Sequence, residues 1–213
     1  MSRVDLYRNV HKGQRARLFS LAVELGRVDG EDATVLADLT ERLRTTLDEL
    51  RRHGEHEESY IHPLLQERAP EIAAELEREH RSVEADMAEF EDMLGATTSD
   101  GGLSLYRAWC RIVASYLQHL DKEEQFAMPS LWRTCSDEEI LAVIGAFSSS
   151  LSASERLNDL LSQAPTLAPQ ELALYVKALG RSQEFSEEKV FDRLAGVLTA
   201  HTLDRLRKDL TRY

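Results

Sequence analysis

Two short segments of the chain carry the same series of histidine, glutamate, aromatic and proline residues. Residues 47–66 align with residues 113–132 without a gap, and each copy contains the pattern H-x3-E-E-x-[YF]-x2-P. In the first copy the histidine is His53 and the first glutamate is Glu57. Residues four apart on a helix lie on one face, one turn apart, so each copy would place an imidazole beside a carboxylate.

The second copy supplies His119 and Glu123, and a further histidine precedes each copy. A weaker match aligns the preceding segments and sets His11 opposite His80. This pattern predicts two helical hairpins, each with one histidine on its first helix and a His-x3-Glu pair on its second. Packed about a pseudo-two-fold axis, the hairpins would bring four imidazoles and two carboxylates together in the interior.

Such an interior needs positive charge, because burying two carboxylates without a partner is very costly. Two divalent cations would supply it, with one carboxylate from each hairpin bridging the metals and the imidazoles in terminal positions. One His-x3-Glu pair is common as a weak surface ion pair, but two copies in register are not explained that way. Spacing alone leaves iron, manganese and zinc open, because mixed histidine and carboxylate sites suit several metals. The predicted metal ligands are His11, His53, Glu57, His80, His119 and Glu123.

Four long amphipathic helices are needed to carry these residues. Apolar residues at three- and four-residue steps predict helices over about residues 4–28, 33–61, 70–94 and 103–127. Pro63 should end or kink the second helix, and Pro129 should stop the fourth. Turns are expected at residues 29–32 and 97–102. Long helices with short connections favour an all-α, antiparallel up-down-up-down four-helix bundle.

The bundle is predicted to occupy residues 1–135, and the shorter helices of residues 136–213 to form a C-terminal helical extension packed on it. The chain has 213 residues, with 38 acidic and 26 basic ones and a formal net charge of −12. No basic stripe offsets this charge, so we expect no nucleic-acid binding. A protein partner or an oligomer formed through the extension stays open.

Two features of the sequence indicate the compartment. No apolar run approaches the roughly 18 residues that span a bilayer, and the N-terminal residues lack the apolar core of a signal peptide. Cys110 and Cys135 form no ligand motif, and we expect free thiols rather than a disulfide. We therefore expect a cytoplasmic protein that does not bind membranes.

Over about residues 3–135 the sequence resembles the hemerythrin-like HHE cation-binding domain family. The segments that carry the resemblance are LYRNVHKGQR (6–15), HGEHEESYIHP (53–63), EH (79–80) and HLDKEEQFAMP (119–129). The resemblance implies an antiparallel four-helix bundle around a non-haem di-iron centre with an oxo or hydroxo bridge. Such centres handle dioxygen or related small oxidants. It also implies a C-terminal extension like that of some bacterial members.

The third helix departs from the pattern of the family's oxygen carriers, which use five histidines and two carboxylates, including an H-x3-H pair on that helix. Here His80 has Leu76 four residues before it and Glu84 four residues after it. Leu76 cannot coordinate a metal, and Glu84 is a candidate seventh ligand. Without Glu84 the site keeps an extra position for water, substrate or peroxide. This favours a reactive centre or a sensor over a reversible carrier.

Aromatic residues accompany the predicted ligands. Tyr60 and Phe126 lie seven residues beyond the histidines of the two copies. They are expected on the ligand face, either as core packing or as a wall over the metal pocket. Tyr7 and Tyr116 are expected as hydrogen-bonding neighbours of the ligands.

Other polar residues near the motif are given simpler roles. Apart from Glu57, the acidic residues 55–58 are expected to form a solvated helix face. His62 precedes the helix-ending proline and is expected at the surface or beside the ligands.

Three functions remain open on the sequence. The leading one is a di-iron protein that binds or reacts with dioxygen or peroxide, as an oxidase, a peroxide-decomposing enzyme or a redox sensor. The second is a pathway-specific di-iron oxygenase acting on an organic substrate, with the extension as a lid. The third is a non-enzymatic iron- or oxygen-sensing module whose extension binds a partner. Whether the protein is an enzyme therefore stays open.

Overall fold

The computed structural model describes residues 3–28, 33–96, 102–180 and 185–211, and these residues form helices and connections without a strand. The predicted turn at 29–32, and most of the one at 97–102, lie outside the described residues. The elements are α1 (Arg8–Leu25), α2 (Ala33–His56), η1 (Glu57–Ile61), α3 (His62–Arg68), α4 (Pro70–Ala96), α5 (Gly102–Lys122), η2 (Glu123–Ala127), α6 (Met128–Thr134), α7 (Asp137–Ser150), α8 (Ala153–Gln163), η3 (Ala164–Thr166), α9 (Pro169–Gly180), α10 (Glu187–Leu194) and α11 (Ala200–Leu210).

The chain divides into two compact units by its internal contacts. The first unit contains residues 1–7 and 14–143, and the second contains residues 8–13 and 144–213. The division therefore falls inside α1, whose first turns are grouped with the C-terminal helices. The domain boundary expected between residues 135 and 136 stays a prediction.

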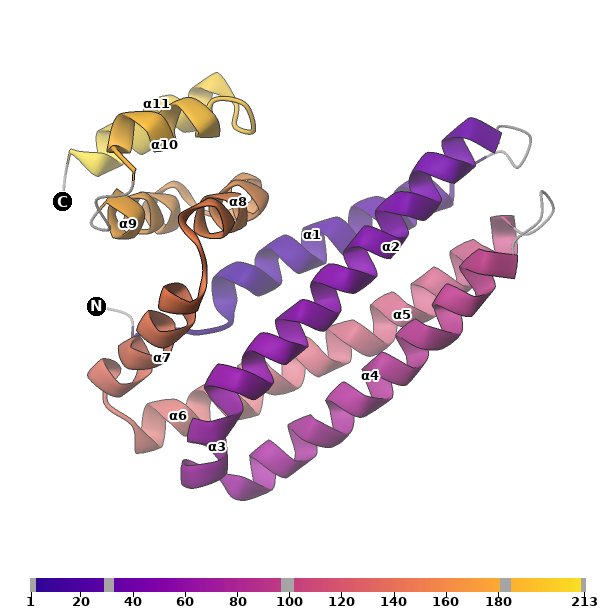
Figure 1. Ribbon diagram of the computed structural model, residues 1–213, viewed down its shortest axis with the longest axis horizontal. Coiled ribbons are helices and arrows are strands. Elements are labelled where there is room, and N and C mark those ends of the chain that lie inside the picture. The colour runs from indigo at the N-terminus through magenta and orange to yellow at the C-terminus, as the bar shows by residue number, and fades with distance from the viewer. Residues whose placement is uncertain (1–2, 29–32, 97–101, 181–184, 212–213) are drawn as a thin grey trace. The chain divides into compact units, whose positions relative to one another are not determined.

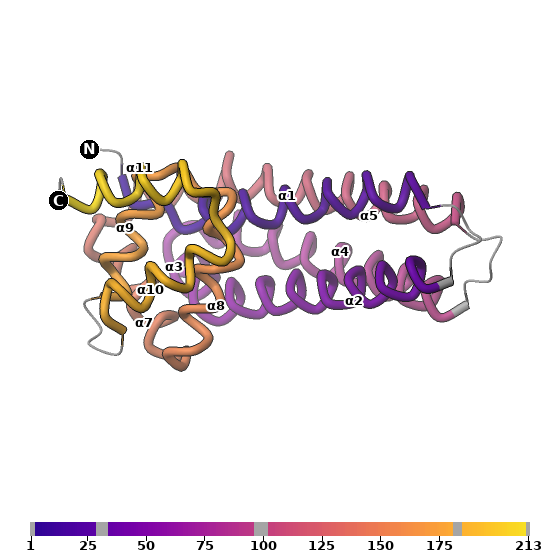
Figure 2. Tube along the Cα trace, turned by 90° about the horizontal axis from the view of Figure 1, so that it is seen from above, coloured from indigo at the N-terminus to yellow at the C-terminus, as the bar shows by residue number. Residues whose placement is uncertain are grey.

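Four long helices of the first unit, α1 from Gln14 onward, α2, α4 and α5, lie side by side (Figures 1 and 2). They share one apolar core, to which α2 contributes Leu39, Leu43 and Leu47 at steps of four residues. This spacing places the leucines on one stripe of the helix, so burying them fixes the face that α2 turns inward. Trp109 of α5 is fully buried in the same core, and its Nε1 donates to the carbonyl of Leu18, 3.3 Å away.

Both copies of the repeated motif contain a π-helical turn, in which a backbone N–H bonds to the carbonyl five residues earlier. The turns η1 (Glu57–Ile61) and η2 (Glu123–Ala127) occupy equal positions in the two copies. In η1 the N–H of His62 donates to the carbonyl of Glu57. Each turn therefore begins at the first carboxylate of its own copy of the motif.

The prediction that Pro129 stops the fourth helix is wrong, and Pro63 does not end the second. Each proline lies in the first turn of a further helix, α3 or α6, that continues for seven residues. A proline has no N–H to donate and crowds the carbonyl four residues earlier, which a regular α-helix cannot accommodate. The widened turn before each proline absorbs this misfit, and the chain stays helical.

A second apolar core closes the end of the first unit beyond the π-turns. Leu65 of α3, Leu76 of α4 and Leu131 of α6 are fully or almost fully buried in it. The N-terminal segment was predicted to begin a helix at about residue 4. It is instead hydrogen-bonded to α6, where Trp132 Nε1 donates to the carbonyl of Val4 over 2.6 Å. The first helix therefore starts only at Arg8.

The second unit has its own core, built from α8 to α11. Its helices start at defined caps: Ser152 and Glu155 form a reciprocal capping box, which satisfies two backbone N–H groups at the start of α8. Within this unit, Lys12 pairs with Glu171 over 2.7 Å. The first turns of α1 are thereby tied to α9.

Two further expectations can be compared with the structure. Cys110 is half-buried and Cys135 is buried, and both are free thiols, as predicted. In the described part of the chain, no helix combines the length and the apolar character needed to cross a bilayer.

Candidate metal centre

Imidazole and carboxylate groups from both copies of the motif converge inside the first unit. His53 Nε2 lies 3.0 Å from Glu57 Oε1, within the first copy. The second copy repeats this pairing, with 3.4 Å between His119 Nε2 and Glu123 Oε1. The i,i+4 spacing places each pair on one helix face, and the π-turn begins directly at the carboxylate.

His80 of α4 joins the two copies. Its Nε2 lies 3.3 Å from Glu57 Oε2 and 3.7 Å from Glu123 Oε1. Its ring meets the ring of His119 edge-on, with the centroids 4.7 Å apart. Donor atoms of Glu57, His80, His119 and Glu123 all lie within 4.8 Å of one another, a grouping that can hold a metal ion.

His53 belongs to a second grouping with the same two carboxylates, also within 4.8 Å. Both groupings share Glu57 and Glu123, as two bridging carboxylates would. His11 is fully buried in the first turns of α1. Residues 8–13 belong to the second unit, so its role as a ligand stays a prediction.

The two carboxylates lie where water cannot stabilise their charge. Glu57 is 1% exposed and Glu123 is 0% exposed. Leaving a carboxylate ionised in such a place is unfavourable by several kcal/mol unless cations and hydrogen bonds compensate it. A metal ion between the carboxylates and the imidazoles would provide that compensation, so the donor set fits the predicted metals.

In the metal-free protein, the protonated His80 ring balances part of the negative charge of the two carboxylates. Burial favours the neutral ring, but the hydrogen bonds that the ring donates to Glu123 and Glu57, together with the negative charges of these residues, outweigh it and raise the pKa of His80 to about 10. His119 behaves oppositely, because burial lowers its pKa. A neutral imidazole is the form that binds a metal, so His119 is prepared for that role.

The predicted tyrosines both lie next to the carboxylates. Burial, together with the charges of Glu123 and Glu57, raises the pKa of Tyr7 well above its usual value. The pKa of Tyr116 is raised by burial and by the same two charges, while a hydrogen bond with Gln14 acts in the other direction. Both hydroxyl groups therefore keep their protons at neutral pH.

Two further residues contact His80: Glu58, expected on a solvated face, and His62, expected at the surface or beside the ligands. Glu58 is exposed, as expected for a solvated face, and its Oε1 lies 3.2 Å from His80 Nδ1. His62 stacks on the same ring, with the centroids 5.0 Å apart and the planes at 17°. The repeat indicates an inward position for His62, because the residue at the equivalent position is the apolar and buried Met128.

The expected position of Phe126 on the ligand face is wrong, since its side chain is 58% exposed. Its counterpart Tyr60 is only half-buried. Both residues lie inside the π-turns, η1 and η2, where the extra residue per turn rotates them away from the direction that a regular α-helix predicts.

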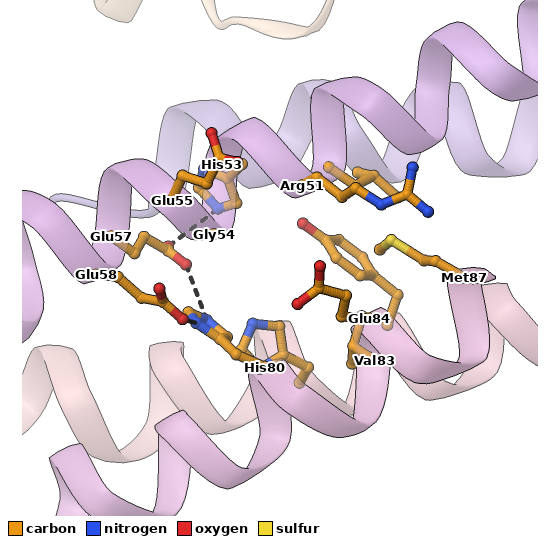
Figure 3. A pocket seen from close by; sticks show the side chains of 13 residues that line it. Arg51, His53, Gly54, Glu55, Glu57, Glu58, His80, Val83, Glu84 and Met87 are labelled. Atoms are coloured by element: carbon orange, nitrogen blue, oxygen red, sulfur yellow. Dashed lines mark hydrogen bonds and ion pairs between the residues drawn. The ribbon is translucent and has the colours of Figure 1, made fainter.

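A cavity of about 70 Å³ opens beside the cluster. Figure 3 shows His53, Glu57 and His80 on one side of it, with the Glu84 carboxylate pointing into the same space. Glu84 is exposed and belongs to neither of the donor groupings that the described residues form. A volume of this size accommodates a few water-sized molecules.

The comparison with known families agrees with this geometry. Residues 2–129 match the family described as hemerythrin HHE cation binding domain. No curated protein and no solved structure gave a significant match. The matched segment covers well over half of the chain and contains both copies of the motif together with His11 and His80. The chain belongs to the hemerythrin HHE cation-binding domain family.

Proposed function

We propose that this protein holds two iron ions and uses them to react with dioxygen or peroxide. The proposed ligands are His11, His53, Glu57, His80, His119 and Glu123, within an antiparallel up-down-up-down arrangement of the long helices. The observation that carries the proposal is the pair of buried carboxylates, each with the imidazole of its own copy within 3.4 Å. Two cations bridged by Glu57 and Glu123 would balance the charge that these carboxylates bring into the core.

Iron fits a mixed histidine and carboxylate donor set, and when bound it would supply redox chemistry toward small oxidants. The protein's own residues prepare that chemistry. Glu58 accepts a hydrogen bond from His80 Nδ1 and so directs Nε2 toward the carboxylates. The cavity beside the cluster has room for a small oxidant and is far below the size of usual organic ligand pockets. This favours dioxygen or peroxide over an organic substrate.

A reactive centre is favoured over an oxygen carrier, because α4 offers His80 without a second histidine one turn away. The position that such a histidine would occupy is either Leu76, buried in the apolar core at the end of the unit, or Glu84, at the cavity. Fewer protein ligands leave more room for an oxidant and for a reductant.

Metal content tests the proposal directly. The full chain, expressed with sufficient iron, should contain about two iron ions per chain by elemental analysis. Glu57→Gln and Glu123→Gln should each lower this content strongly and to a similar degree, because the two residues are equivalent in the repeat. Glu124→Gln is the matched control, since it changes the next residue, whose carboxylate binds Arg15 over 2.6 Å. Normal iron content in Glu57→Gln and Glu123→Gln would refute the bridging roles.

Reaction with oxygen separates a reactive centre from a carrier. The reduced protein, mixed with oxygenated buffer in a stopped-flow spectrometer, should oxidise and keep the oxidised spectrum after oxygen is removed. Recovery of the reduced spectrum on removing oxygen would identify a reversible carrier and contradict this part of the proposal.

A further inference from the structure

The cavity beside the metal centre breaks the symmetry of the repeat. The alignment of residues 47–66 with 113–132 sets Gly54 opposite Leu120. Gly54 lines the cavity, whereas Leu120 is fully buried in the main core of the first unit. One copy thus leaves open the space that the other copy fills with a leucine side chain.

The space that Gly54 leaves lies against His80. A Cβ atom at residue 54 would lie 3.9 Å from His80 Nδ1 and 4.0 Å from its Cε1, which is ordinary van der Waals contact. An alanine therefore fits, but a longer side chain would extend into the cavity. Glycine within a helix costs about 1 kcal/mol relative to alanine, so its presence in α2 needs a reason beyond helix stability. Room beside His80 provides one.

The two copies also differ in the charges of two residues near the cluster. The weaker alignment that sets His11 opposite His80 also sets Arg15 opposite Glu84, and the stronger one sets Glu124 opposite Glu58. Arg15 and Glu124 form a two-pronged ion pair of 2.6 and 3.1 Å. At the equivalent place, Glu84 and Glu58 are two carboxylates that both line the cavity.

These two differences have one physical consequence. An arginine and a glutamate attract and close one side of the unit, whereas two carboxylates repel and cannot close the other by pairing. Arg51, which also lines the cavity, is held by Glu91 over 2.6 and 2.9 Å. Its ion pairs are with Asp48 and Glu91, and its charge acts on Glu84 only at longer range.

We infer that a ligand of two or three heavy atoms enters between α2 and α4 and binds beside His80 and His119, in the space left by Gly54. The inference rests on the proposed function, and it assigns the ligand to the metal position that Glu57, His80, His119 and Glu123 would hold. Gly54 determines the size of the ligand, and Glu58 and Glu84 keep the entrance open. Dioxygen, hydrogen peroxide and azide have the required size.

Azide binding to the iron-loaded full chain tests this inference, because azide reports an accessible metal position without turnover. Gly54→Leu introduces the residue that the other copy carries and should weaken azide binding at least about tenfold, as expected for an overfilled site. Gly54→Ala adds only one methyl group and should weaken azide binding less than Gly54→Leu does. Both variants should retain their iron. Wild-type azide affinity in an iron-loaded Gly54→Leu protein overturns the inference.

A variant of α4 tests the entrance to the cavity. Glu84→Arg recreates the ion pair of the other copy with Glu58 and should slow azide association about tenfold. Glu89→Arg, on the exposed face of α4, makes the same change of net charge and should leave the rate unchanged or raise it slightly. If the Gly54→Leu protein loses its iron, the Glu84→Arg protein tests the inference instead. An unchanged rate of azide association in the Glu84→Arg protein then overturns the inference.

The outcomes also separate this inference from the proposed function. If the unchanged protein contains no iron after iron-replete expression, the proposed function fails. If it contains two iron ions and binds azide, but neither Gly54→Leu nor Glu84→Arg alters binding, the proposed function stands and only the position of the ligand is wrong.

Discussion

At the scale of single residues, the two glutamates of each motif have separate tasks. The first, Glu57 or Glu123, is buried among imidazoles. The second reaches a different partner in each copy: Glu58 contacts His80, and Glu124 contacts Arg15. Neighbouring residues of one type are therefore distinguished by burial and by the group that each one meets.

Glu58 should act on the metal through His80. Glu58→Gln removes the charge that fixes the Nδ1 proton of His80, so metal affinity should fall by about 10-fold or more, as is usual when such supporting carboxylates are lost. Competition with a metal chelator measures the affinity. Glu55→Gln, which also lines the cavity, is the control and should leave the affinity unchanged. Equal affinities in the two variants would show that Glu58 does not position His80.

The charge balance of the buried carboxylates gives a prediction for stability. In the metal-free protein Glu57 and Glu123 share one protonated His80, which leaves an excess negative charge in the core. Glu57→Gln removes that excess and should stabilise the metal-free protein by about 1–3 kcal/mol. The same variant should lose the stabilisation that metal provides.

Thermal unfolding with and without a chelator measures both effects. Glu124→Gln changes only a half-exposed ion pair, so it should alter stability by less than about 1 kcal/mol in either state. A metal-free Glu57→Gln protein that unfolds at a lower temperature than the unchanged one would contradict the charge argument.

At the scale of helices, the π-turns decide which side chains face the centre and which face the core beyond it. Each turn adds a residue to the path of the helix, and one residue corresponds to about 100° of rotation in an α-helix. His53 before the turn and Leu65 after it can therefore both face inward. In a regular α-helix, the spacing between these two residues would direct their side chains to different faces.

Deleting Ser59, an exposed residue within η1, tests this geometry. The deletion restores regular spacing and should turn Leu65 out of the core at the end of the unit. Loss of a fully buried leucine and its neighbours costs about 2–5 kcal/mol, so the protein should unfold at markedly lower temperature. Ser59→Ala is the control and should behave like the unchanged protein. A deletion variant with unchanged stability would show that the extra residue has no structural role.

The sequence predicted those parts of the fold that obey a regular period. The helix expected over residues 70–94 is α4, Pro70–Ala96, because its apolar residues recur at helical spacing and a proline starts it. The convergence of Glu57, His80, His119 and Glu123 was also predictable, because it depends on a repeat that the sequence displays.

What the sequence did not predict depends on the π-turns and on packing between helices. A widened turn has no period of its own in the sequence, so Phe126 was assigned to the wrong face. The contacts of Glu58 and His62 with His80 join residues 22 and 18 positions apart in different helices, and they exist only once the helices pack. The cavity at Gly54 likewise needs the packed structure, although the contrast with Leu120 was present in the sequence.

At the scale of the whole molecule, the chain contains two units with separate apolar cores. The donor groupings of the first unit involve none of the residues of α8 to α11. A unit with its own core can unfold as a separate cooperative block, and a ligand stabilises the block that binds it.

Calorimetry should therefore show two unfolding transitions, and that of the first unit should respond more strongly to metal, because five of the six proposed ligands belong to it. Removing iron with a chelator should lower the transition of the first unit; a metal present at 100 times its dissociation constant contributes about 2.7 kcal/mol. The transition of the second unit, which contains only His11 of the proposed ligands, should shift by less. Variants of its core, such as Leu172→Ala, should shift mainly the transition of the second unit. A single transition that shifts as a whole would show that the units unfold together.

The paired π-turns also bear on how this sequence can diverge. A one-residue insertion interrupts the regular hydrogen-bond ladder of a helix, and a deletion would restore it. We expect that the π-turns at the same place in both copies are kept for the geometry of Glu57 and Glu123. Where a descendant no longer uses the centre, that constraint ends. We expect such lineages to accumulate single-residue deletions between residues 57 and 61 or between 123 and 127, together with compensating changes in the apolar residues that follow. A short gap there, and not only a replaced histidine, would be the genetic trace of a lost metal site.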